Sequence, residues 1–231
     1  MKKVIALSSI TGVCLLTSIS AFAANQPAKS GLTISGQGSF NFTPNQTFNA
    51  TSNNTNDASN ISTSNGGFGG ALFLGYNYAI TPNITIGTKV GYQYIYQVNQ
   101  FKASYNLPGF NNANDQVNVN NIPLLFTANY YFNSGWLVGI EGGIDFQKWT
   151  LKQTGDSNYI YNNMGDQHNF SSQWNTAPMA GLSFGYQWQS SIALTASADY
   201  IFGNKTSDIT SVNTNQPLAL YNIGLNLSYT F

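Results

Sequence analysis

Cysteine, charge and long apolar runs are all scarce in this chain of 231 residues. The single cysteine, Cys14, lies close to the N-terminus, so the rest of the chain offers no disulfide and no thiolate metal ligand. Charged residues make up only 7% of the sequence, against about 25% in an ordinary soluble domain. After residue 23, no stretch approaches the roughly 18 apolar residues of a membrane-spanning helix. These absences argue against a disulfide-stabilised domain, an ordinary soluble domain and a helical membrane protein.

The N-terminal segment has the features of a secretory signal peptide. Lys2 and Lys3 precede an apolar run from Val4 to Leu16, and the small-x-small triplet Ala21-Phe22-Ala23 follows. Such a segment is removed on export, here after about residue 23. The remaining 208 residues (231 − 23) are enough for one all-β domain. They hold six lysines and eight acidic residues, a net charge of −2 (6 − 8), which does not suggest a nucleic-acid partner.

The last eleven residues alternate strictly between apolar and polar side chains. Such alternation predicts a β-strand with one apolar face and one polar face. The chain ends on the aromatic residue of this apolar face. The apolar positions are Tyr221, Ile223, Leu225, Leu227, Tyr229 and Phe231.

Seven more segments show the same alternation, so the sequence predicts eight strands. The predicted strands are Leu32–Phe42, Phe68–Ile80, Ile84–Tyr96, Ile122–Phe132, Trp136–Phe146, Trp174–Trp188, Ile192–Phe202 and Tyr221–Phe231. Tight turns at 81–83, 133–135 and 189–191 alternate with long polar loops at 43–66, 97–116, 148–173 and 203–217. A change of parity near Asn120 and Asn121 predicts a β-bulge there. Pro123 and Pro178 remove ladder donors, so we expect bulges or later strand starts beside them.

This pattern, with the terminal Phe231, resembles the bacterial outer-membrane β-barrel family of the OmpA transmembrane-domain, OmpX and opacity-protein type. The resemblance implies an all-β fold, an eight-stranded antiparallel up-and-down transmembrane barrel with four long extracellular loops and three short periplasmic turns. It divides the chain into a signal peptide (1–23), a short periplasmic lead (24–30) and the barrel (31–231). It also implies that Phe231 and Tyr229 form an assembly signal. The implied partners are periplasmic chaperones, the barrel-assembly machinery, outer-membrane lipid and lipopolysaccharide, with no cofactor.

The aromatic residues fall at two depths of the predicted strands. Between these two groups the outward positions are mostly aliphatic or glycine. Two aromatic belts around an aliphatic band are expected at the two interfaces of a bilayer. We expect Tyr78, Phe132, Trp136 and Trp188 at the turn side, and Phe42, Tyr96, Trp174 and Phe202 at the loop side.

Four charged residues occur within the predicted strand cores: Lys89, Glu141, Asp145 and Asp199. All four lie at polar-face positions, so we expect them inside the barrel. Lys89 and Glu141 occupy equivalent depths and are predicted to form an ion pair. One lysine cannot neutralise three acids, so Gln37, Gln93 and Gln187 are expected to share their solvation. The cluster is interpreted either as a polar plug of a narrow barrel or as a gate or cation site in a small pore.

Catalysis has little support in the sequence. The chain is similar in size to outer-membrane lipid A deacylases, but its one histidine, His168, lies in a polar loop with Asp166, Ser171 and Ser172. No strand holds a nucleophile and base within hydrogen-bonding reach there, and no metal-ligand set is present. The expected function is structural, or surface interaction through the loops with a host molecule, a phage or a lipopolysaccharide sugar. The alternatives are a narrow pore and, more remotely, a lipid A-modifying enzyme.

Overall fold

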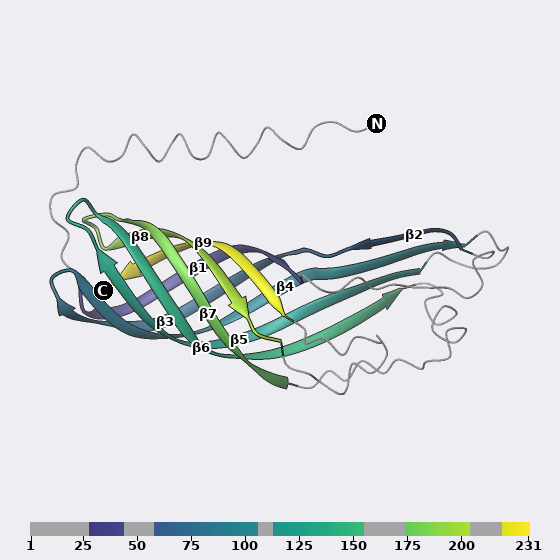
Figure 1. Cartoon of the computed structure of the whole chain (residues 1–231), viewed down its shortest axis with the longest axis horizontal. Helices are drawn as coiled ribbons and strands as arrows, with labels where there is room; N and C mark the ends of the chain where they lie inside the picture. Colours follow the sequence, from purple (N-terminus) through teal and green to yellow (C-terminus); the bar gives the residue numbers. More distant parts are fainter. Residues whose placement is uncertain (1–27, 44–57, 106–112, 155–173, 204–218) are drawn as a thin grey trace.

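The computed structural model describes residues 28–43, 58–105, 113–154, 174–203 and 219–231 as an all-β structure (Figure 1). The strands are β1 (Gly31–Phe42), β2 (Ala58–Ser64), β3 (Gly67–Thr81), β4 (Ile84–Tyr105), β5 (Ala113–Tyr131), β6 (Trp136–Thr154), β7 (Trp174–Gln187), β8 (Ile192–Ile201) and β9 (Leu220–Thr230). In these parts of the chain, no helix is long and apolar enough to span a membrane.

Eight of the nine strands form a closed antiparallel barrel. The sheet runs in the order β4-β3-β1-β9-β8-β7-β6-β5, and pairing of β4 with β5 closes it. β1 pairs with β9 from Thr33↔Thr230 to Phe42↔Tyr221, so the first and last strands are neighbours. The remaining strand, β2, lies outside the barrel and pairs only with the C-terminal end of β4. The predicted eight-stranded up-and-down barrel and its three tight turns are confirmed.

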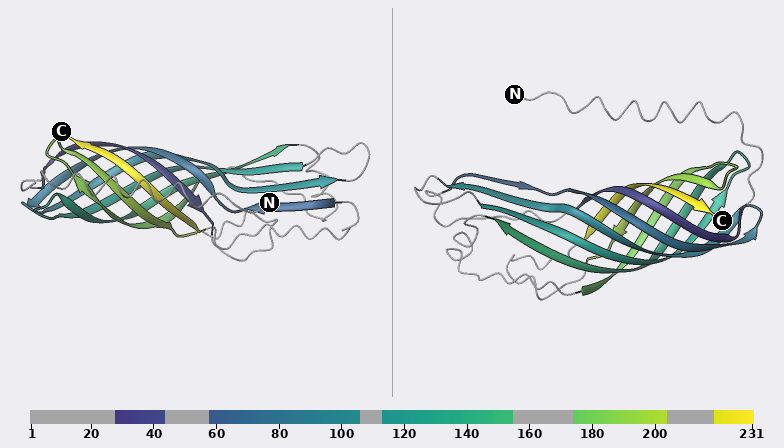
Figure 2. Two further views of the ribbon diagram at one scale, coloured as in Figure 1. Left: turned by 90° about the horizontal axis from the view of Figure 1, so that it is seen from above. Right: turned by 180° about the vertical axis from the view of Figure 1, so that it is seen from behind.

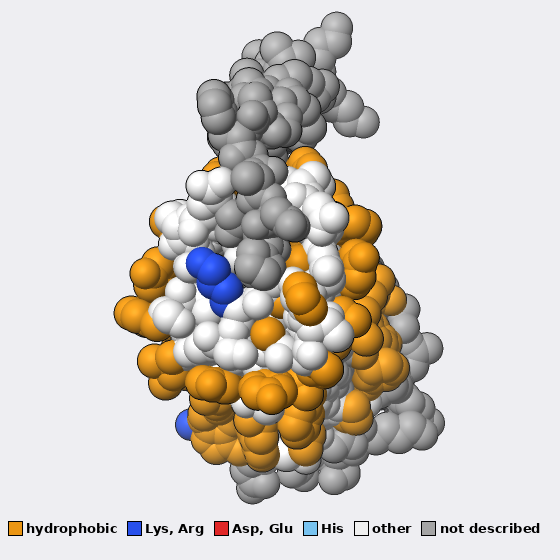
Figure 3. Space-filling model, turned by 90° about the vertical axis from the view of Figure 1, so that its left-hand side faces the viewer, with side chains coloured by type: hydrophobic (Ala, Val, Ile, Leu, Met, Phe, Trp, Pro, Cys, Tyr) orange, Lys and Arg blue, Asp and Glu red, His pale blue; other side chains and the backbone are white. Residues whose placement is uncertain are grey.

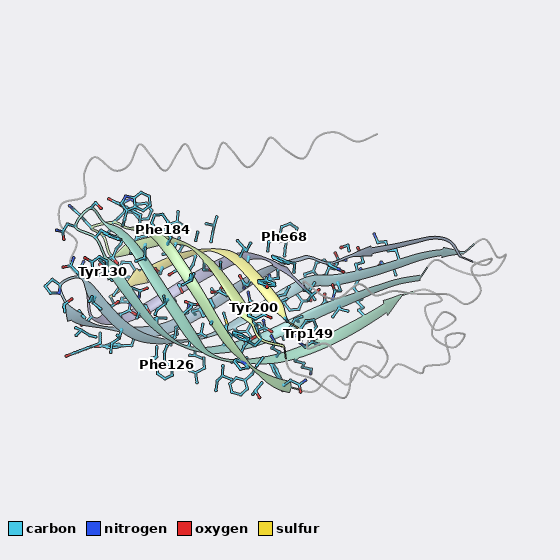
Figure 4. The ribbon with its side chains drawn as sticks, in the orientation of Figure 1. Phe68, Phe126, Tyr130, Trp149, Phe184 and Tyr200 are labelled. Atoms are coloured by element: carbon cyan, nitrogen blue, oxygen red, sulfur yellow. The ribbon has the colours of Figure 1, made fainter. Side chains whose placement is uncertain are left out.

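The barrel turns its apolar side chains outward. Leu72, Phe126, Ile140 and Leu225 are 72%, 68%, 61% and 62% exposed, and Figure 4 shows Phe68, Phe126 and Phe184 pointing away from the barrel. Seen from its turn end, the molecule carries hydrophobic side chains around its flanks, while backbone and side chains that are neither hydrophobic nor charged predominate in the middle (Figure 3). A soluble domain would bury these side chains, because their exposure to water is unfavourable. The outer surface therefore fits hydrocarbon, as an outer-membrane barrel requires.

Aromatic side chains gather at the loop end and at the turn end of the barrel. At the loop end, ring contacts 4.7–6.3 Å between centroids form a continuous row across β3, β1, β9 and β8. The members of this row are Phe68, Phe40, Phe42, Tyr221, Tyr200 and Phe202. At the turn end, Trp136 stacks on Phe184 at 5.0 Å, and Tyr186 lies between Trp136 and Trp188. The predicted interface residues Tyr78, Tyr96, Trp174 and Phe132 are 42–59% exposed.

Several predicted loops are shorter than expected because the strands continue beyond the barrel. β4 runs to Tyr105, β5 starts at Ala113 and β6 ends at Thr154, inside segments predicted as loops. β2 likewise lies in the predicted first loop. The four strands β2, β4, β5 and β6 form a sheet that projects from one side of the rim (Figure 2). We call this sheet the extension. Its strands do alternate in part, at Phe101, Ala103 and Tyr105, at Val117 and Val119, and at Trp149 and Leu151. These runs are short and have the parity opposite to that of the outward apolar residues of the same strand, so they do not read as continuations of the barrel strands.

The predicted bulge exists, but it lies on the other strand. The register between β4 and β5 shifts between Ile95 and Asn99, where Gln97 has a φ of 53°. The Asn118 side chain accepts a hydrogen bond of 2.9 Å from the Gln97 backbone N–H. On β5, Asn120 and Asn121 pair regularly. The apparent change of parity on β5 arises because Val117 and Val119 face the interior, 3% and 0% exposed.

Pro123 and Pro178 lie inside β5 and β7 without a bulge. Both strands keep a continuous register with β6 through Pro123↔Asp145 and Ile144↔Pro178. On its other side, the β4–β5 ladder is interrupted at Gly91 and Tyr92, opposite Pro123. The β7–β8 ladder begins only at Met179, one residue after Pro178. Each proline thus stands where a ladder is broken or has not begun, so its missing N–H is tolerated.

Candidate functional site

The inside of the barrel is the candidate site, because all four charges of the strand cores point into it. Its turn-side half encloses a cavity of about 100 Å³. The lining is mainly hydroxyl and carboxamide side chains, and it includes Lys89, Glu141, Gln37 and Ser197. We call this space the polar cavity. Its small volume agrees with an eight-stranded barrel, whose interior is largely filled by side chains.

The predicted ion pair between Lys89 and Glu141 is present. Lys89 Nζ lies 2.7 Å from Glu141 Oε2, and the two side chains are 20% and 9% exposed. The two side chains meet across β5, the strand between β4 and β6. Lys89 on β4 pairs with Leu125, and Glu141 on β6 pairs with Thr127, two residues further along β5. The Lys89 ammonium also lies 4.8 Å from the centre of the Phe73 ring, which adds a cation–π attraction. The pair links β4 to β6 inside the barrel.

Asp199 lies next to this ion pair because residue 181 between them is glycine. Asp199 on β8 pairs with Gly181 on β7, which pairs with Glu141 on β6. A Cβ at residue 181 would overlap Asp199 Oδ1 and would stand 3.1 Å from Glu141 Cγ. Ser197 donates a hydrogen bond of 3.3 Å to Asp199, and Gln37 donates one of 2.9 Å to Ser197. The missing side chain therefore allows the Asp199 carboxyl group to lie beside Glu141, and Asp199 Oδ1 is buried there without a hydrogen-bond partner.

Replacing Gly181 with alanine is therefore expected to destabilise the barrel by roughly 1–3 kcal/mol, since the new methyl group displaces a buried carboxyl group. Urea unfolding of the barrel refolded into lipid vesicles measures this change. Gly142→Ala is the matched control, because a Cβ there meets only the Met179 carbonyl, at an ordinary 3.6 Å. Equal losses in the two variants would show that Gly181 is not needed to accommodate the acids.

Asp145 belongs to a second polar group, nearer the loop end. Gln147 donates a hydrogen bond of 3.0 Å to Asp145 Oδ2 and accepts one of 3.2 Å from Trp149 Nε1. Asp145 is fully buried, and its Oδ1 has no protein partner. The structure therefore separates Asp145 from the Lys89–Glu141 pair, whereas the sequence suggested one cluster of four charges. Asp145 is solvated by a glutamine, as expected, but by Gln147 rather than by Gln37, Gln93 or Gln187.

A third group links β5, β4 and β1 by carboxamides. Asn121 donates to Gln93 at 3.1 Å, Gln93 donates to Ser39 at 3.2 Å, and Asn41 donates to Ser39 at 2.9 Å. These side chains meet across β3 because it carries Gly69 at this level, where a Cβ would stand 2.8 Å from Ser39 Oγ. The interior is thus polar over much of its height, as a polar plug requires.

Apolar side chains close the interior at the loop end. Ten buried residues pack together there, from every barrel strand except β1 and β3. This loop-end cluster consists of Ile95, Val98, Val117, Val119, Leu125, Trp149, Ala177, Met179, Ile201 and Leu220. The sequence correctly placed Ile95, Met179 and Ile201 inside, with Phe73 and Leu137. It missed the cluster as a unit because its members come from six strands, with one to three from each.

A smaller apolar group and residues 28–30 lie at the turn end. Ala28, Tyr131, Leu137 and Ala193 pack together and are at most 8% exposed. The Ala28 N–H donates to the Pro82 carbonyl, and Lys29 Nζ donates to Ser191 Oγ at 2.8 Å. The segment before β1 is therefore tied to the β3–β4 turn and to the β7–β8 turn.

The remaining sequence candidates can be placed only in part. His168, Asp166, Ser171 and Ser172 lie outside the described residues, as do the predicted signal peptide and most of the predicted lead. Within the parts of the chain that the structure describes, no three His, Cys, Asp or Glu side chains are grouped so as to hold a metal ion. Tyr229 and Phe231 project outward, 41% and 68% exposed, with ring centres 4.9 Å apart. Their role as an assembly signal stays a prediction.

Comparison with known proteins finds similar folds only. No family model and no curated protein matches the chain. Among solved structures, Neisserial surface protein A is 14% identical with a TM-score of 0.47, covering 88% of this chain and 100% of its own. OprG from Pseudomonas aeruginosa is 15% identical with a TM-score of 0.46, covering 90% and 100%. Ail, the attachment invasion locus protein of Yersinia pestis, is 10% identical with a TM-score of 0.42, covering 87% and 97%.

Proposed function

We propose that this eight-stranded outer-membrane β-barrel neither conducts solutes nor catalyses a reaction, and that it acts through its extracellular surface. The observation that supports this proposal is the contrast between its two parts. Apolar side chains pack together inside the barrel at the loop end and at the turn end. The extension, in contrast, carries ordered strands well past the rim, as far as Tyr105 on β4 and Thr154 on β6. Strands that far outside the membrane have no part in spanning it.

Planar-bilayer recordings are expected to show no reproducible channels for the mature barrel, and Glu141→Gln is expected to leave this result unchanged. The loop-end cluster blocks the path, so removing the ion pair does not open it. A quadruple variant, with Ile95→Ser, Val119→Ser, Met179→Ser and Ile201→Ser, should produce channels. It replaces large apolar side chains of the loop-end cluster with small polar ones. Reproducible wild-type channels whose conductance changes in Glu141→Gln would instead establish a pore.

The surface role is tested by trimming the extension while the barrel stays intact. Residues 101–115 are deleted, and an Asn-Gly dipeptide joins Gln100 to Gln116, which are paired in the register. This change also removes the residues of β4 on which most of β2 pairs. Bacteria displaying the full barrel are expected to adhere to cultured epithelial cells, and bacteria displaying the trimmed barrel are not. Equal adherence of the two strains, or none with either, would count against a host-surface role.

The absence of catalysis is tested on lipid A itself. Lipid A extracted from cells that express the barrel is expected to keep the acyl chains of the parent strain. Mass spectrometry detects any loss. Loss of an acyl chain that disappears in a His168→Ala variant would make the protein an enzyme and would overturn this part of the proposal.

A further inference from the structure

Three of the six lysines after residue 23 lie on one face of the extension. They are Lys102 on β4 and Lys148 and Lys152 on β6. All three have the outward parity: Lys148 and Lys152 alternate with Gln147 and Trp149, which face the interior. Lys102 pairs with Asn114 on β5. Even-numbered residues of β5 such as Asn114 lie on the face opposite to that of the buried residues Val117 and Val119, so Lys102 faces outward. We call this set the lysine face. Lys102 lies far from Lys148 and Lys152 in the sequence, which gives no sign that the three gather.

The lysine face begins at the membrane surface. Lys148 pairs with Asn120 on one side and with the half-exposed Trp174 on the other. Trp174 belongs to the loop-side aromatic belt, so Lys148 stands at the interface. Lys152 lies four residues further along β6, about 13 Å at the usual rise of a strand. Lys102 lies two strands away from β6 at a similar distance from the membrane, about 12 Å from Lys152.

The surroundings of the lysines suit a phosphorylated sugar. Carboxamides stand between them on the same face, and Gln100 donates a hydrogen bond of 3.0 Å to Asn114. Carboxamides donate to and accept from sugar hydroxyl groups, while ammonium groups attract phosphate. Glu141, Asp145 and Asp199, the acids whose side chains the structure describes, all point into the barrel and are not on this face.

We propose that the lysine face binds the phosphate groups of lipopolysaccharide in the outer leaflet. A neighbouring lipopolysaccharide molecule places its acyl chains against the apolar outer surface of the barrel. Its phosphorylated disaccharide then lies directly above the loop-side aromatic belt. That is where Lys148, and then Lys152 and Lys102, are found. Their ammonium groups can replace the divalent cations that otherwise bridge adjacent phosphates. This inference requires only that the extension stands outside the membrane, and it does not depend on adherence to host cells or on a closed interior.

The test uses the mature barrel refolded in a zwitterionic detergent, so that no native lipopolysaccharide is present. Diphosphorylated lipid A in mixed micelles is titrated against the wild type and against Lys102→Gln, Lys148→Gln and Lys152→Gln, singly and together. The triple variant is expected to bind at least about tenfold more weakly, with a smaller salt dependence, since each lysine contributes a screened attraction. The single variants give intermediate losses. They keep the proposal testable should the triple variant fail to fold.

Lys29→Gln is the matched control, because Lys29 lies at the turn end beside Ser191. It should bind lipid A like the wild type. Dephosphorylated lipid A and phosphatidylglycerol are the comparison lipids, and both should bind more weakly than diphosphorylated lipid A. Equal binding of dephosphorylated lipid A would mean that only acyl chains are recognised, and equal binding of phosphatidylglycerol would mean unspecific attraction to anionic lipid. Either result, or a triple variant with unchanged affinity, would overturn the proposal.

Discussion

Lys89→Met is expected to cost about 3 kcal/mol of the free energy of unfolding, a large effect for one substitution in this barrel. The substitution keeps the length and much of the volume of the side chain but removes its charge. Glu141, 9% exposed, loses its partner at 2.7 Å, and Asp199 beside it loses the same nearby cation. Removing the cation leaves the carboxylates buried without a partner. The free energy lost in this way is larger than the net free energy that the intact ion pair contributes to folding. Urea titration in lipid vesicles, followed by tryptophan fluorescence, measures the change.

Two further variants separate the ion pair from a simple packing defect. The double variant Lys89→Met and Glu141→Gln should recover part of the loss, because it removes one of the two unpaired charges, that of Glu141, and leaves Asp199. Glu141→Gln alone should cost less than Lys89→Met, because Lys89 then still has Asp199 nearby. Lys29→Met, which removes a lysine at the turn end, should change stability by no more than about 0.5 kcal/mol. If the double variant were as unstable as Lys89→Met, the loss would come from packing and not from charge.

Leu225→Arg is expected to destabilise the barrel by about 2–4 kcal/mol in a bilayer. Leu225 lies in the middle of β9, paired with Gly38 and Ala196, and 62% of its side chain is exposed on the outer surface. In water, arginine at such an exposed position would be nearly neutral. In hydrocarbon, its guanidinium group must be desolvated or must draw water and headgroups inward. The sign and size of the effect therefore report directly on the surroundings of the outer surface.

The control for this prediction is Ile80→Arg. Ile80 is similarly exposed, at 54%, but it lies one residue before the end of β3, beside the tight turn. Arginine there can reach the interface, so the expected cost is only about 0–1 kcal/mol. The same vesicle unfolding assay compares the two variants. Equal costs at the two depths would show that a hydrocarbon layer does not surround the middle of the barrel.

The barrel could be predicted because the membrane imposes a simple rule on it. Within the bilayer every second residue must be apolar, so Tyr221 to Phe231 and seven similar segments reveal their strands by alternation alone. The same rule places Lys89 and Glu141 inside, and their positions relative to the strand starts suffice to predict that they meet. The aromatic belts follow from the two interfaces.

The extension and the details of the interior could not be predicted, for different reasons. Phe101, Ala103 and Tyr105 do alternate with polar residues on β4, but they have the parity opposite to that of Ile84 to Tyr96, because the register shift at Gln97 lies between the two runs. Inside, contacts between strands depend on the register, which the sequence alone does not give. Gly181 shows this well, since its role beside Asp199 and Glu141 appears only when three strands are aligned.

The uneven rim of the barrel gives the molecule distinct flanks in the plane of the membrane. On the flank of β8, β9 and β1 the strands stop at an uninterrupted row of aromatic rings. On the opposite flank, a wall of β-sheet rises above the lipid. Among the described residues, a neighbour that approaches the low flank meets the aromatic row, whereas one that approaches the high flank meets lysines and carboxamides. In a crowded leaflet the protein would therefore adopt a preferred rotation about the membrane normal relative to its neighbours.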